Sequence, residues 1–128
     1  MEYKNYGLLQ KIEINSRRHK NFFYYNTHNT DLHELTKFAV YMQLRKLGYD
    51  VWVEAKLTQN KGIPDIIAMK DNKGIIIEIL NTEVIKLGKK PNPKKLKYPS
   101  EFEFIEIKAS RAGLEQDLEK LYDRLEAL

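Results

Sequence analysis

The sequence predicts an α/β domain in which a helix precedes three strands, and a helix, a strand and a helix follow them. Two observations lead to this fold class. Some segments repeat apolar residues with a helical period, whereas others are short runs rich in Val and Ile. The two kinds of segment also alternate along the chain, as they do in α/β domains. The 128 residues fit a single domain, divided into an N-terminal arm, a core and a C-terminal helix at 1–30, 31–109 and 110–128.

The first helix is expected to begin at Thr30-Asp31 and to end before Gly48, because glycine commonly terminates helices. Its apolar residues recur three or four positions apart, which predicts a stripe along one side of the helix. The stripe consists of Leu32, Leu35, Ala39 and Met42, with Phe38 and Leu47 beside it. The arm before this helix is polar and irregular, with one short strand expected at 8–14.

The first strand of the sheet is expected at 51–57, where polar and apolar side chains alternate. Its apolar face holds Val51, Val53, Ala55 and Leu57, and its other face holds Trp52, Glu54 and Lys56. The next two strands are expected at 65–70 and 75–80, and residues 71–74 predict a tight hairpin turn between them. The third strand is almost entirely apolar, which is typical of a central strand covered on both faces.

Asn81 or Thr82 is expected to cap a helix that runs to about residues 88–90. An irregular segment with three prolines then leads to a fourth strand at 102–109 and to a closing helix from about Arg111. The closing helix repeats leucine at intervals of four and three residues, at Leu114, Leu118, Leu121, Leu125 and Leu128. These leucines either cover the sheet or form a short coiled-coil seam between two subunits, which would make the chain a protein-interaction module.

The composition excludes several kinds of site and several classes of protein. There is no cysteine, so disulfide frameworks, thiolate zinc sites and cysteine nucleophiles are excluded. The N-terminal residues are too polar for a signal peptide, and no apolar run reaches the length of a membrane span. We therefore expect a soluble cytoplasmic protein without a membrane partner. His19, His28 and His33 lack the spacing of a metal site, so surface or capping roles are expected for them.

The net charge is +4, from 22 basic and 18 acidic residues, and the basic residues gather in two segments. Basic surfaces attract phosphate backbones through the release of counterions. The candidates for contacts with DNA are Arg17, Arg18, Lys20, Lys89, Lys90, Lys94 and Lys95. The aromatic residues 22–25, beside the first segment, either stack on bases or pack onto the domain. The simpler interpretation of both segments is a solvated, lysine-rich surface.

Two acidic residues stand in segments that otherwise have the composition of buried strands. Asp65 follows Pro64 and precedes four apolar residues, and Glu78 follows three isoleucines. A buried carboxylate is usually paired, protonated or bound to a metal ion. Two carboxylates on adjacent strands would form a site for a hard cation such as Mg²⁺. The simpler alternatives are a turn role for Asp65 and an exposed edge-strand position for Glu78.

The element order, with Asp65 at the start of the second strand and Glu78 late in the third, resembles the PD-(D/E)xK nuclease superfamily. That superfamily includes restriction endonucleases and archaeal Holliday junction resolvases, and the matching segment covers about 32–109. The resemblance implies a restriction endonuclease-like αβββαβ core, with a mixed central sheet flanked by helices and an extra C-terminal helix. It also implies a homodimeric, Mg²⁺-dependent DNA endonuclease, with Mn²⁺ as a substitute, that acts on structures such as junctions or branched DNA.

The same resemblance assigns roles to individual residues. Asp65, Glu78 and the backbone carbonyl of Ile79 would ligate the metal ion, and Glu34 in the first helix would bind a further metal or a water. Glu34 also has a structural alternative. It stands three residues after Asp31, which is the spacing of a capping box at a helix N-terminus.

The chain departs from the nuclease pattern at Leu80, where these enzymes carry a lysine that orients and stabilises the attacking hydroxide. Leucine can neither donate a hydrogen bond nor balance charge. A lysine from another element would restore the function, and Lys56 is the expected one because it shares a strand face with Glu54. Weaker candidates are Lys70, Lys86 and Lys89. Without such a lysine, the resemblance implies a catalytically inactive nuclease-fold protein that binds DNA or a protein partner.

Overall fold

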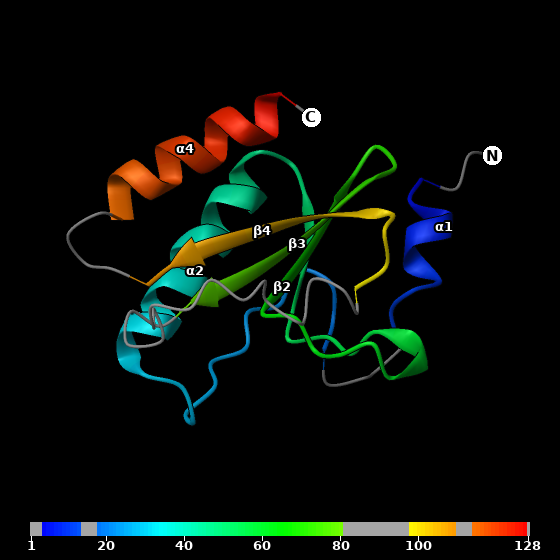
Figure 1. The fold of residues 1–128 in the computed structure, drawn as a ribbon, viewed down its shortest axis with the longest axis horizontal. Coiled ribbons are helices and arrows are strands. Elements are labelled where there is room, and N and C mark those ends of the chain that lie inside the picture. Colours follow the sequence, from blue (N-terminus) through cyan, green and yellow to red (C-terminus); the bar gives the residue numbers. More distant parts are fainter. Residues whose placement is uncertain (1–3, 14–17, 81–97, 110–113, 128) are drawn as a thin grey trace, which may run out of the picture.

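The computed structural model describes residues 4–13, 18–80, 98–109 and 114–127, which form an α/β fold around a four-stranded sheet (Figure 1). This confirms the predicted fold class. The described elements are α1 (Tyr6–Leu9), α2 (Asp31–Lys46), β1 (Asp50–Val53), the 3₁₀ turn η1 (Thr58–Asn60), β2 (Ile66–Lys70), β3 (Lys73–Leu80), β4 (Phe102–Lys108) and α4 (Leu114–Glu126). The helix expected after the third strand, and the expected beginning of the closing helix, lie outside the described residues. No described helix has the length and apolar composition that a membrane crossing requires.

The four strands lie in the order β1, β2, β3, β4. The first two pairings are antiparallel and the pairing of β3 with β4 is parallel, so the sheet is mixed. β3 lies between two other strands and is buried from Gly74 to Ile79. Its central position, predicted from its apolar sequence, is therefore confirmed. β4 also agrees within one residue with the strand expected at 102–109.

The turn between β2 and β3 has the form that the sequence predicts. Its two central residues, Asp71 and Asn72, have φ values of 49° and 66°. Positive φ at both central positions is typical of a type I′ hairpin turn, and Asp and Asn adopt it more readily than most residues. Asn72 also holds the N-terminal arm. Its side chain accepts a 2.6 Å hydrogen bond from the Asn5 amide, and the Asn5 side chain accepts a 2.7 Å bond from the Asn72 amide.

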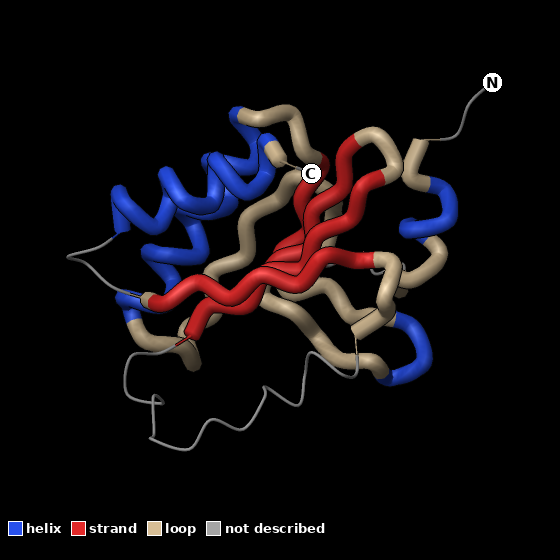
Figure 2. Tube along the Cα trace, turned by 45° about the horizontal axis from the view of Figure 1, so that its top comes forward, coloured by secondary structure: helices blue, strands red, loops and turns tan. Residues whose placement is uncertain are grey.

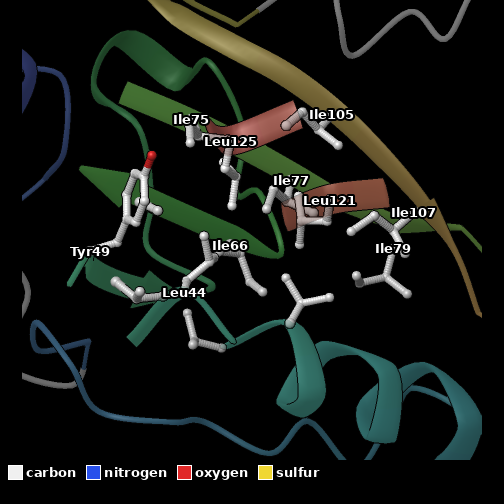
Figure 3. Packing of buried hydrophobic residues seen from close by; sticks show 14 of the residues in the cluster. Leu44, Tyr49, Ile66, Ile75, Ile77, Ile79, Ile105, Ile107, Leu121 and Leu125 are labelled. Carbon is white, nitrogen blue, oxygen red and sulfur yellow. The ribbon is translucent and has the colours of Figure 1, made fainter. Parts of the chain in front are cut away.

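α2 and α4 cover one face of the sheet (Figure 2). Leu44 of α2 and Leu121 and Leu125 of α4 point into this layer, where they meet isoleucines of three strands (Figure 3). Those isoleucines are Ile66, Ile75, Ile77, Ile79, Ile105 and Ile107. Because Leu121 and Leu125 are buried, the described leucines of α4 cover the sheet, which is the first of the two interpretations of the leucine repeat.

The opposite face of the sheet has a second apolar cluster, to which α1 contributes Leu8. Its buried members are Leu8, Ile12, Trp52, Ala55, Leu57, Ile67, Met69, Ile76, Tyr98 and Phe102. Both faces of the sheet are thus covered. Side chains of β3 alternate between the two clusters, with Ile75 and Ile77 on one side and Ile76 on the other.

α2 does not bury the side that its apolar residues predict. Leu35, Phe38 and Met42 are exposed, with 54%, 42% and 39% of their surface accessible. The buried residues are instead His33, Glu34, Thr36, Lys37, Val40 and Leu44. The C-terminal half of this face is apolar and packs in the core, whereas its N-terminal half is polar. The polar half is buried because it finds charged partners on the sheet.

The strand expected at 8–14 is wrong for the residues that the structure describes. The chain forms the short helix α1 at the start of this segment, and Ile12 makes an isolated antiparallel bridge with Leu57. The amide of Lys11 and that of Ile12 bond to carbonyls three residues earlier, which continues a helical turn rather than an extended strand. Local hydrogen bonds thus take the place of an extended strand up to Ile12, and among the described residues pairing with another segment is limited to the bridge, where the Glu13 amide donates to the Lys56 carbonyl and the Thr58 amide donates to the Lys11 carbonyl.

β1 is shorter than expected and ends at Val53. Glu54 follows with a φ of 52°, in the left-handed region that a residue other than glycine seldom adopts. This residue breaks the alternation of the strand. Ala55 and Leu57 consequently join the second apolar cluster, whereas Val53 packs in the first.

Gly74 provides a test of the packing between β3 and the second cluster. A Cβ atom at this position would lie 2.6 and 2.8 Å from two ring carbons of Phe102 and 3.0 Å from a methyl carbon of Leu8. We expect Gly74→Ala to lower the free energy of unfolding by about 1–3 kcal/mol, because overpacking forces neighbours apart. Urea denaturation measures the change.

Gly7→Ala is the matched control, because a Cβ there meets no atom within 4 Å and the position lies in α1. Alanine should leave the stability unchanged or raise it by up to about 1 kcal/mol. If Gly74→Ala is as stable as Gly7→Ala, the close packing of Phe102 on β3 is wrong.

Candidate functional site

Six polar side chains from four segments meet near the N-terminal end of α2, and we call them the polar cluster. They are His33, Glu34 and Lys37 of α2, Glu54 after β1, Asp65 before β2 and Glu78 of β3. His33, Glu34, Lys37 and Glu78 are no more than 4% exposed, and the side chains of Glu54 and Asp65 are 14% exposed. Charged groups are seldom buried to this extent unless they are paired or functional.

Lys37 is completely buried and lies between two carboxylates. Its Nζ donates to Glu34 Oε1 at 2.6 Å and to Glu54 Oε2 at 2.8 Å. The ammonium also lies 5.4 and 5.9 Å from the ring centres of Phe23 and Tyr24. Sequence reasoning missed this residue. The available signal was its spacing from Glu34, because residues three apart share one side of a helix.

Glu34 accepts hydrogen bonds from two further donors, the backbone amide of Asn26 and the Nδ2 of Asn29. The capping box with Asp31 is therefore not formed. Thr30 is the N-cap, and its hydroxyl accepts from the His33 amide at 3.2 Å. Burial favours the neutral acid, but the hydrogen bonds from Lys37 and the other donors outweigh it and lower the pKa of Glu34.

The backbone of Glu54 brings its side chain to Lys37. Because its φ is positive, the chain leaves the strand while its amide still donates to the Asp65 carbonyl at 3.0 Å. Its carboxylate accepts from Asn26 Nδ2 at 2.8 Å as well as from Lys37. Strained backbone of this kind is retained where the surrounding contacts require it, often at functional sites.

His33 joins Glu34 to Asp65. Its Nδ1 lies 3.0 Å from Glu34 Oε2, and its Nε2 lies 3.5 Å from Asp65 Oδ2. Of the surface or capping roles expected for His33, the surface role is wrong, since the side chain is buried. Burial would lower the pKa of His33, but its hydrogen bonds with Asp65 and Glu34 outweigh this effect and raise the pKa.

Asp65 lies beside Glu78, as the strand spacing predicts. Its Oδ2 accepts from the Ile79 amide at 2.8 Å, so the side chain reaches across to β3. Burial acts to raise the pKa of Asp65, but the hydrogen bonds with His33, the Ile79 amide and Glu78 lower it overall. Asp65 therefore favours the ionised form although it is mostly buried.

Glu78 has a partner that the sequence did not suggest. The hydroxyl of Tyr98 donates a hydrogen bond to Glu78 Oε1. Burial and the neighbouring Glu78 carboxylate raise the pKa of Tyr98 far above its ordinary value, so this hydroxyl stays protonated. No periodic pattern marks Tyr98, which follows the proline-containing segment.

The other predicted residues lie away from the polar cluster. Lys56 Nζ is 3.9 Å from Glu13, and its side chain is 43% exposed. Lys70 donates to the Leu47 carbonyl at 2.7 Å. Two of the DNA-contact candidates in the first basic segment, Arg18 and Lys20, are described, and both have partners within the domain. The guanidinium carbon of Arg18 lies 3.5 Å from the centre of the Tyr24 ring, and Lys20 Nζ lies 3.8 Å from Asp50 Oδ2. Outside the described residues lie Arg17, Lys86, Lys89, Lys90, Lys94 and Lys95.

The polar cluster contains carboxylate oxygens and an imidazole nitrogen, which are atom types that ligate cations. Four carboxyl groups face one ammonium and one imidazole at low exposure, so acidic side chains outnumber basic ones in the polar cluster. Among the described residues, no three acidic or histidine side chains already form a metal-binding group. A groove of about 510 Å³ reaches Glu34 from the surface, between Phe23, Tyr25, Asp31, Leu35 and Phe38.

The ion pairs of Lys37 lead to a stability test. Lys37→Met would leave the carboxylates of Glu34 and Glu54 buried beside an apolar chain of similar length. Loss of one partner from a buried ion pair costs about 3–5 kcal/mol, and we expect a decrease of this size in the free energy of unfolding. Denaturant unfolding at neutral pH gives the value.

Lys56→Met is the control, because Lys56 forms an exposed pair with Glu13. It should change the stability by less than about 1 kcal/mol. Equal stabilities of the two methionine variants would contradict the buried ion pairs.

The shifted pKa values predict how stability depends on pH. The lowered pKa values of Glu34 and Asp65 stabilise the fold fully above an unfolded pKa of about 4, and this contribution is lost as the pH falls through the folded values. The raised pKa of His33 stabilises the fold below about pH 6.5, and this contribution is lost as the pH rises through the folded value. The free energy of unfolding, measured between pH 3 and 9, should therefore be highest at about pH 4.5–6.5 and should decrease at both lower and higher pH.

His33→Asn should remove the alkaline decline, because asparagine does not titrate. His28→Asn should retain it, because His28 is exposed. An alkaline decline of the same size in both variants would show that another group causes it.

Comparison with protein-family models, with curated proteins and with solved structures finds no match to this chain.

Proposed function

We propose that this protein is a divalent-metal-dependent DNA endonuclease of the PD-(D/E)xK type. The observation that carries the proposal is the contact between Asp65 and Glu78 at the edge of a strand pair. β2 and β3 pair in the register Ile66↔Ile77, and one further step of this register places Asp65 opposite Glu78. Side chains at opposite positions of an antiparallel pair lie on the same face, about 4.5–5.5 Å apart at Cβ.

The donor atoms fit a hard dication. Asp65 favours its ionised form, and the excess of carboxylates in the polar cluster favours added positive charge. The family resemblance adds the carbonyl of Ile79 as a third ligand. When bound, such a cation supplies Lewis acidity at the scissile phosphate and a more acidic water. The Tyr98 hydroxyl, which donates to Glu78 Oε1, would compete with a bound cation for that oxygen.

Lys37 is the buried cation of the polar cluster, and it lies on α2 rather than at position 80. A chain of close contacts leads from Lys37 through Glu34 and His33 to Asp65. Lys37 is too enclosed to contact a substrate in this arrangement, so we assign it a positioning role. It neutralises Glu34, and Glu34 in turn orients the imidazole beside Asp65. Lys37 therefore acts from α2 rather than from position 80.

The second candidate function is a nuclease fold that binds DNA or a protein without cleavage. Two observations favour it: Leu80 stands at the lysine position, and both carboxylate partners of Lys37 hold its ammonium away from Asp65. This alternative predicts DNA binding that weakens with salt and no cleavage with any divalent metal. Activity gained by Leu80→Lys would support it.

Cleavage assays distinguish the two functions. Supercoiled plasmid and a synthetic four-way junction should be cut with Mg²⁺ or Mn²⁺ and not with EDTA. Asp65→Asn and Glu78→Gln each remove one charge from the site with little change in volume. Each should lower the cleavage rate at least about 100-fold, because the metal polarises the phosphate and the water together.

Glu13→Gln is the matched control, since it changes an exposed carboxylate that pairs with Lys56. It should cut like the wild type. Cleavage by Asp65→Asn and Glu78→Gln at the wild-type rate would refute the proposed function.

The proposal also includes two partners, DNA and a second copy of the chain. DNA is the proposed substrate, and a homodimer would present two sites to two strands. Analytical ultracentrifugation with and without junction DNA measures the oligomeric state directly.

A further inference from the structure

We infer that the outward side of α2 is a dimer interface, on which α2 of a second copy of the chain packs in the antiparallel direction. This inference rests on the homodimer in the proposed function and names the surface that forms it. The observations that carry it come from α2 and from the arm beside it, and they are independent of Asp65 and Glu78.

The side of α2 that faces away from the sheet is apolar along most of its length. In this fully described helix the exposed residues are Asp31, Leu35, Phe38, Met42, Arg45 and Lys46. They recur at intervals of four and three residues up to Arg45, so they lie on one side of the helix. The three in the middle are all apolar, whereas Val40 and Leu44 on the inner side pack in the core. A helix that is apolar on both sides is normally covered on both.

A rigid aromatic groove lies beside this apolar side of α2. The groove of about 510 Å³ that reaches Glu34 is lined by Phe23 and Tyr25 of the arm and by Leu35 and Phe38 of α2. The Phe23 and Phe38 rings meet edge to face, with their centres 4.8 Å apart. Phe38 is therefore held in place before a partner arrives. Aromatic side chains that are already ordered lose little entropy on binding, and they often carry most of the affinity of an interface.

The charges at the two ends of α2 determine the direction of the partner helix. The first turn presents the exposed Asp31, and the last turn presents the exposed Arg45 and Lys46. Two antiparallel copies bring the acidic end of each helix to the basic end of the other, and their dipoles also favour this direction. Two parallel copies would place like charges side by side. Because Arg45 already donates to the Tyr49 carbonyl at 2.7 Å, Lys46 is the expected partner of Asp31.

One register satisfies the apolar and the charged contacts together. A two-fold axis beside Phe38 places Leu35 opposite Met42 of the partner subunit. The same axis places Asp31 opposite the partner's Lys46, and symmetry makes each contact occur twice. Methionine is flexible and fills irregular gaps, so it suits the groove beside Leu35. This side of α2 is thus complementary to itself, which favours a second copy of the chain over an unrelated protein.

Sedimentation velocity of the full chain, without DNA or divalent metal, tests the inference. The wild type should sediment as a dimer. Met42→Glu should weaken the dimer at least about 100-fold, because it leaves an unpaired charge in an apolar contact. The fold should be undisturbed, since Met42 is exposed and a glutamate four residues before Lys46 stabilises a helix. Thermal unfolding checks that this variant and those below are folded.

Tyr122→Glu is the matched control, because it places the same charge at an exposed apolar position of α4. It should dimerise like the wild type. A dimer that is lost in Tyr122→Glu and kept in Met42→Glu would place the interface on α4 and overturn the inference.

Exchange of the end charges tests the antiparallel direction. Asp31→Lys and Lys46→Asp should each weaken the dimer by about tenfold, since each places like charges opposite each other in two symmetric pairs. The variant with both substitutions restores opposite charges and should regain most of the wild-type affinity. If neither single substitution changes the affinity, the antiparallel register is wrong.

The outcomes separate this inference from the proposed cleavage. A wild type that is monomeric at every concentration overturns the interface, whereas Asp65→Asn and Glu78→Gln still test cleavage by their own assays. A wild type that dimerises through α2 but never cuts DNA refutes the endonuclease and leaves the interface standing.

Discussion

The burial of Lys37 between Glu34 and Glu54 is the interaction on which the rest of the site depends. An ammonium and two carboxylates can leave water together only when each is paired, because an isolated buried charge is far too costly. The pairing turns the polar half of α2 toward the sheet and holds the left-handed Glu54 at the end of β1. It also fixes Glu34, which orients His33 toward Asp65. One buried cation thus joins the main helix, the first strand and the candidate site.

The strands could be read from the sequence because their patterns are local. The isoleucine run of β3 and the Asp71-Asn72 turn predict the hairpin, and the hairpin register alone brings Asp65 to Glu78. The exposed side of α2 could not be read in this way. Periodicity counts apolar side chains, and here charged partners on other segments decide which side of the helix is buried. That partnership is a tertiary contact, and no local pattern records it.

The same reason explains the missed residues. Lys37 has an ordinary spacing from Glu34, and its importance appears only when Glu54 arrives from another segment. The positive φ of Glu54 is rare for glutamate, so propensity predicts a continued strand there. Tyr98 reaches Glu78 across the second cluster from a distant part of the chain. Contacts between remote positions carry most of the chemistry of this site, whereas the two carboxylates of the hairpin are its local part.

The hairpin of β2 and β3 has a consequence for the order in which the chain folds. Only a short loop separates Asp65 from Glu78, whereas β4 must cross a much longer connection to pair with β3. Loop closure costs more chain entropy for the longer segment, and local contacts generally form first. The two carboxylates therefore come together in the earliest part of the sheet to fold. The hairpin itself supplies Asp65 with the Ile79 amide as a donor, whereas His33 of α2 and Tyr98 become partners of the pair when distant segments dock.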